Sequence, residues 1–146
     1  MMDPQDFLDL ARQLSARDDA SACRTAISRA YYAAYHVAAG ILRNEMGVRI
    51  PSGAEGHGAV HNCLALCEDP DVRPVGHRIA NLYSDRVRAD YHLDTRDVEK
   101  ARNARVRVDD AQMIIGILRK CLGDNARLRA MRDALSKAAA TKRFLL

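Results

Sequence analysis

The sequence has no tryptophan and only two phenylalanines, four prolines and eight glycines among its 146 residues. Alanine, leucine and arginine are abundant by contrast, and these residues lose little conformational freedom on entering a helix. This composition favours an all-α fold and argues against an all-β one. The length leaves room for one compact domain of the usual ~100–200 residues, which excludes a two-domain enzyme.

Long hydrophobic runs are also absent, since no stretch approaches the roughly 18–20 apolar residues of a membrane span. The first six residues, MMDPQD, are acidic where a secretory signal peptide would be basic. We therefore expect a cytoplasmic protein with no membrane partner.

Cysteine is scarce, with four residues that could form two disulfides. A domain of this length with a hydrophobic core does not need such cross-links, and three of the four occupy apolar positions of helical patterns. We expect reduced cysteines buried in the core. The four residues are Cys23, Cys63, Cys67 and Cys121.

Helical periodicity divides the chain into six predicted helices. Glycine, proline and serine between positions 47 and 58 predict a loop, and the charged stretch 93–105 predicts a long connection with about one turn of helix. The alanine-rich segment 20–44 allows close approach of its neighbours, as in the central helix of a bundle. The predicted helices span residues 3–16, 20–44, 57–68, 75–91, 108–122 and 125–140.

Charge is distributed unevenly along the chain, whose net charge is +4. Residues 119–146 hold eight basic and two acidic side chains, so they carry +6 and the rest carries −2. We expect residues 1–123 to form the bundle and 124–146 to form a basic C-terminal helix of the same domain. Such a segment suits a polyanionic partner, although a solvated helix face has the same composition. The candidate nucleic-acid-binding residues are Arg127, Arg129, Lys142 and Arg143.

Two charged residues, Arg86 and Asp90, are predicted on the packing side of their helix, together with Ile79 and Leu82. A charge placed there must be paired or functional, because an isolated buried charge costs several kcal/mol. The two residues form an internal ion pair, or Arg86 lines a cleft and binds phosphate with its planar fork.

His92 ends the same helix. In a straight helix its side chain lies about 120° around the axis from Arg86 and on nearly the same face as Arg88. Local geometry therefore favours a pairing of Arg88 with His92.

The i, i+4 spacings of His57 with His61 and of Cys63 with Cys67 both occur in zinc sites. The two pairs point about 120° apart on one helix, so a four-ligand zinc site is not expected, and the histidines cap the helix or line a groove. No phosphate-binding glycine loop, nucleophile elbow or CxxC motif is present. We expect no metal and no cofactor.

Three segments of the chain resemble small HEPN domains (higher eukaryotes and prokaryotes nucleotide-binding). The segment 24–36, RTAISRAYYAAYH, is similar to their first long helix, and HGAVH at 57–61 and RVRADYH at 86–92 follow in the same order. With the helix from Val108, the resemblance covers roughly residues 5 to 122.

The resemblance implies an antiparallel, up-and-down helical bundle that forms a homodimer, often encoded beside a minimal nucleotidyltransferase in toxin–antitoxin or defence modules. Many HEPN proteins are metal-independent endoribonucleases with an Arg/His motif, which Arg86 and His92 match, here with Asp90, Tyr91 and Arg88 as supporting residues. In that interpretation Arg86 and His92 form a composite site at the dimer interface, where histidine transfers the proton and arginine binds the scissile phosphate of RNA. The alternative is a non-catalytic, nucleotide-binding accessory protein that docks the nucleotidyltransferase.

Overall fold

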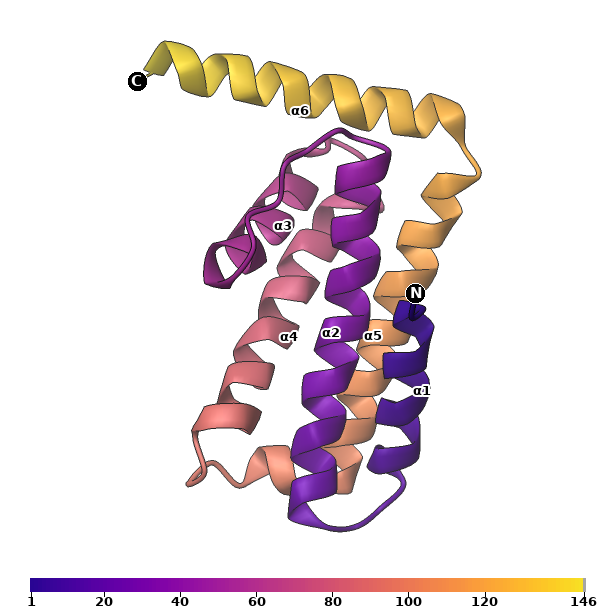
Figure 1. Ribbon diagram of the computed structural model, residues 1–146, viewed down its shortest axis with the longest axis vertical. Coiled ribbons are helices and arrows are strands. Elements are labelled where there is room, and N and C mark those ends of the chain that lie inside the picture. The colour runs from indigo at the N-terminus through magenta and orange to yellow at the C-terminus, as the bar shows by residue number, and fades with distance from the viewer. Residues whose placement is uncertain (146) are drawn as a thin grey trace.

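The computed structural model describes the backbone of residues 1–145 and the side chains of residues 1–141, a part of the chain with helices and no strand. Four of the helices, α1, α2, α4 and α5, run alternately down and up (Figure 1), so the predicted all-α antiparallel bundle is confirmed. The elements are α1 (Pro4–Ser15), α2 (Ala20–Asn44), α3 (Ala54–Leu66), α4 (Arg73–Tyr91), the 3-10 turn η1 (Asp97–Glu99), α5 (Ala101–Leu122) and α6 (Asn125–Leu145).

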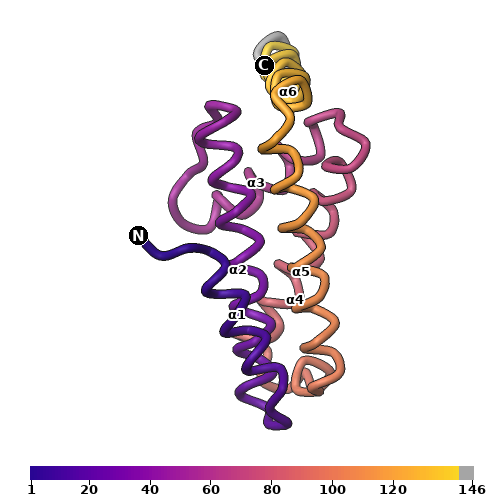
Figure 2. Tube along the Cα trace, turned by 90° about the vertical axis from the view of Figure 1, so that its right-hand side faces the viewer, coloured from indigo at the N-terminus to yellow at the C-terminus, as the bar shows by residue number. Residues whose placement is uncertain are grey.

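The long helix α2 is the centre of the bundle and packs against α1, α4 and α5 (Figure 2). Asp19 caps its N-terminus, where the side chain accepts a hydrogen bond from the backbone N–H of Ala22 at 2.9 Å. Small side chains let the neighbouring helices come close, because an alanine fills little of the space between two helix axes. The fully buried alanines of α2 are Ala26, Ala30, Ala33, Ala34, Ala38 and Ala39.

Helix α6 crosses the end of the bundle (Figure 1). Leu128 and Met131 on its first turns are buried in the same hydrophobic core as the other helices. Arg127 attaches it to the loop between α3 and α4, with bonds to both carboxylate oxygens of Asp69 at 2.9 and 3.0 Å. The basic C-terminal segment therefore begins as a packed helix.

Two helices begin three or more residues earlier than the sequence predicts. Helix α3 begins at Ala54 within the predicted loop 47–58, and α5 begins at Ala101 within the predicted connection 93–105. In α3 one of the glycines that suggested a loop, Gly56, has a packing role, since a Cβ there would lie 2.8 Å from the Tyr35 hydroxyl. In α5 the first turns have a single fully buried residue, Ala104, so their periodicity is weak.

Three cysteines lie in the core as free thiols, as predicted: Cys23, Cys67 and Cys121. Burial raises the pKa of the Cys67 thiol to about 12, so this sulfur stays protonated and unreactive. Cys63, which was also expected in the core, is instead half-buried and packs against the edge of the core. Across the described helices, none combines the length and the apolar character needed to cross a membrane.

Candidate functional site

The internal ion pair that the sequence allowed is present on α4. The Arg86 side chain is only 7% exposed, and its Nη1 lies 3.4 Å from Oδ2 of Asp90. The same carboxylate oxygen accepts a hydrogen bond from the Ser28 hydroxyl at 3.1 Å. Asp90 therefore joins α4 to α2, and its side chain, 31% exposed, stays in contact with solvent.

Four tyrosine rings surround the Arg86 guanidinium. Its central carbon lies 5.2 Å from the ring centre of Tyr83, 5.3 Å from Tyr32, 5.7 Å from Tyr31 and 6.0 Å from Tyr91. Such contacts stabilise a cation that has lost its water, because the faces of the rings are electron-rich. The buried Nε of Arg86 has no hydrogen-bond partner. Arg86 thus keeps one donor that the described part of the chain does not satisfy.

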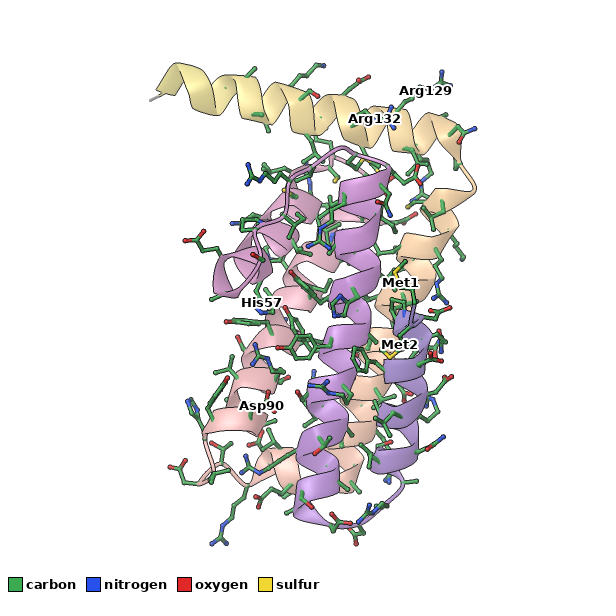
Figure 3. All side chains as sticks on the ribbon, in the orientation of Figure 1. Met1, Met2, His57, Asp90, Arg129 and Arg132 are labelled. Carbon is green, nitrogen blue, oxygen red and sulfur yellow. The ribbon has the colours of Figure 1, made fainter. Side chains whose placement is uncertain are left out.

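His57 lies beside Arg86, although the sequence pattern did not indicate it. It lies near the start of α3, where its Nδ1 is 2.6 Å from the Tyr31 hydroxyl and its ring centre is 4.9 Å from those of Tyr35 and Tyr83. Figure 3 shows His57 and Asp90 on the same side of the bundle. Burial, reinforced by the positive charge of Arg86, lowers the pKa of His57, so the ring is neutral at pH 7. The residues Ser28, Tyr31, Tyr32, His57, Tyr83, Arg86 and Asp90 are called the Arg86 cluster below.

The cluster continues outward into three rings and one guanidinium near the surface. This group is called here the aromatic surface and consists of Phe7, Arg29, Tyr32 and His36. His36 is exposed, and it stacks on Phe7 and on Tyr32 with centroid distances of 6.0 and 6.2 Å and interplanar angles of 28° and 29°. The Arg29 guanidinium lies 5.0 Å from the Phe7 centroid and 4.9 Å from that of Tyr32. Tyr32 belongs to both groups, so the rings are continuous from buried Arg86 to exposed His36.

His92 is the C-terminal cap of α4 and is exposed. Its backbone is held by the buried Arg24, which bonds to four carbonyl oxygens between residues 88 and 95 and forms an ion pair with Glu99 at 2.9 Å. Tyr91, next to it, is 70% exposed. The backbone at the end of α4 is therefore tied to α2 by hydrogen bonds, and two side chains there are exposed to solvent.

Within one chain, the described contacts do not join the side chains of Arg86 and His92. Arg88, predicted to face His92, forms ion pairs with Asp85 and Asp97 instead. Asp85 precedes Arg88 by three residues on α4 itself. Asp97 is within reach because η1 folds back beside α4, which no periodicity within a single helix indicates.

The half-buried His61 has an Nδ1 atom that is buried without a partner. Among the described residues, no three histidine, cysteine or acidic side chains gather as metal ligands would.

The predicted nucleic-acid-binding residues of the C-terminal segment lie in different settings. Arg127 is engaged with Asp69 and also with Asp71 at 3.3 Å, and its hydrogen bonds lower the pKa of Asp69. Arg129 is exposed on α6 (Figure 3). Lys142 and Arg143 lie outside the described side chains.

Comparison of the chain with protein-family models, with curated proteins and with solved structures found no match. The likeness to HEPN domains rests on the three segments of the sequence analysis and stays a prediction.

Proposed function

We propose that the protein is a HEPN-type helical bundle that binds single-stranded RNA over the Arg86 cluster and the aromatic surface. The observation that carries the proposal is the continuous series of rings from Arg86, with its unsatisfied donor, to the exposed His36. Unstacked RNA bases bind to aromatic rings and guanidinium planes, and arginines contact the phosphates between them. The aromatic surface has rings for the bases, Tyr32 and His36, and beside them a guanidinium for the phosphates, that of Arg29.

The His36→Ala variant tests this proposal. Removal of one stacking ring costs about 1–3 kcal/mol of binding free energy, so we expect RNA affinity to fall by a factor of roughly 5 to 150. The measurement is fluorescence anisotropy with a short labelled single-stranded RNA of mixed sequence, at a fixed salt concentration because phosphate contacts make the affinity salt-dependent.

The matched control is His77→Ala, which removes another exposed histidine from the N-terminal half of α4. We expect this variant to bind RNA like the wild type. Wild-type protein without affinity for RNA, or equal affinities for the His36 and His77 variants, would contradict the proposal.

A second candidate function is metal-independent RNA cleavage by a homodimer, with Arg86 from one copy and His92 from the other. The specific observation in its favour is the exposed end of α4, whose backbone Arg24 holds by hydrogen bonds, because a histidine held there is available to a second copy. In this reaction the RNA 2′-hydroxyl attacks the adjacent phosphorus and loses its proton to a base. The 5′-oxygen then leaves with a proton, and a 2′,3′-cyclic phosphate remains. Histidine suits the proton transfers and arginine the phosphate.

Cleavage is expected to persist in the presence of a chelator, to yield 2′,3′-cyclic ends and to be lost in His92→Ala, with His77→Ala as the control. An equimolar mixture of His92→Ala and Arg86→Lys should regain part of the activity, because a mixed dimer restores one of its two composite sites. If the wild type and His92→Ala leave the RNA equally intact, the cleavage function is excluded and the RNA-binding function remains.

A further inference from the structure

The hydrogen bond between Tyr31 and His57 determines which nitrogen of the histidine carries the proton. The Tyr31 side chain is fully buried, and His57 Nδ1 at 2.6 Å is the partner of its hydroxyl. Burial raises the pKa of Tyr31, so the phenol keeps its proton. A buried hydroxyl that accepted from Nδ1–H would leave its own proton without an acceptor, which is costly. Tyr31 therefore donates, and Nδ1 accepts.

A neutral imidazole that accepts at Nδ1 carries its single proton at Nε2. The rings of Tyr35 and Tyr83 flank His57, each with its centroid 4.9 Å away, and hold the plane of the imidazole. The charged and titratable groups around the ring are Arg86 on α4, His36 on α2 and the tyrosines Tyr31, Tyr32, Tyr35 and Tyr83. Both Arg86 and His36 disfavour a second positive charge on His57. His57 thus has a fixed N–H donor beside a cationic guanidinium.

We propose that His57 contacts the RNA directly and donates from Nε2–H to the same phosphate group that Arg86 neutralises. The inference rests on the proposed RNA-binding function and assigns it a second phosphate anchor. A neutral donor next to Arg86 adds a directed hydrogen bond without the repulsion that two adjacent cations would experience. The role of Tyr31 in this arrangement is to position His57 and to select its tautomer.

Two substitutions at the same position separate this role from a structural one. The amide of His57→Gln places an N–H donor near the position of Nε2, whereas that of His57→Asn lies near Nδ1 and can keep the bond to Tyr31. We expect His57→Gln to retain most of the RNA affinity and His57→Asn to bind roughly tenfold more weakly, the cost of one hydrogen bond to a charged group. Thermal melts should rank the two variants in the opposite order.

A purely structural His57 predicts that affinity follows thermal stability, with His57→Asn the better binder, and that result would overturn the inference. Equal affinities of both variants and wild type would also overturn it, although the RNA-binding proposal would stand. If the wild-type protein does not bind the labelled RNA at all, the proposed RNA-binding function itself is wrong.

A measurement on the wild type avoids any effect of substitution on folding. Long-range ¹H–¹⁵N correlation spectra report which imidazole nitrogen carries the proton. We expect the Nε2–H tautomer of His57, and a shift of the Nε2 signal on addition of the RNA. The Nδ1–H tautomer, or a His57 that becomes imidazolium as RNA binds at about pH 7, would contradict the inference.

Discussion

Replacement of Arg24 by alanine is expected to lower the free energy of unfolding by roughly 3–5 kcal/mol, the range for breaking a buried, hydrogen-bonded ion pair. The Arg24 side chain is 10% exposed and forms an ion pair with Glu99. It also donates to four carbonyl oxygens between residues 88 and 95. Helices end with carbonyls that lack partners within the helix, so the substitution leaves part of the end of α4 unsatisfied. Denaturant unfolding at equilibrium measures the change.

The matched control is Arg12→Ala. Arg12 forms an ion pair with Asp109 at 3.2 Å, but the two side chains are 52% and 68% exposed. Exposed pairs of this kind contribute about 0–1 kcal/mol. Equal losses in the Arg24 and Arg12 variants would show that the bonds at the end of α4 do not contribute as the structure indicates. Because Arg24 positions the backbone of His92, any RNA cleavage should fall with it.

Replacement of Arg86 by alanine is expected to cost roughly 2–4 kcal/mol of stability, from the loss of the Asp90 ion pair and of the cation–π contacts with the tyrosine rings. The loss could be as small as about 2 kcal/mol because Asp90 is not left without partners after the substitution. Its carboxylate still contacts solvent and still accepts the hydrogen bond from the Ser28 hydroxyl. The double variant Arg86→Ala with Asp90→Ala should therefore recover only part of the loss. Thermal melts are compared at one protein concentration, since the stability of a dimer depends on it.

Full recovery in the double variant would mean that Arg86 serves mainly to neutralise Asp90, which would count against a role in phosphate binding. Arg86→Lys separates the two roles further. It keeps the charge but loses the planar fork, so we expect weaker RNA binding with a smaller loss of stability than in Arg86→Ala. A lysine variant that binds RNA like the wild type would show that Arg86 supplies only charge.

Local features of the fold and the site were predictable from the sequence because they depend on neighbours along one helix. The Arg86–Asp90 ion pair spans four residues, so helical geometry places the two side chains together wherever the helix packs. The pairing of Arg88 with His92 had the same spacing and did not form between their side chains, because Asp85 and Asp97 offer Arg88 opposite charges. Spacing shows which pairs are within reach, and the surrounding charges decide which of them forms.

What the sequence by itself determined is the class of the fold, the central alanine-rich helix and the placement of Arg86 on a buried face. The tertiary structure alone decided that His57 on α3 lies beside Arg86, and that Arg24 on α2 holds the end of α4 across more than sixty positions of sequence. Helical periodicity repeats every few residues and shows which face of a helix is buried. It contains nothing about the partner of that face, because partner and register are set by the packing of side chains between helices, as at Gly56 against Tyr35.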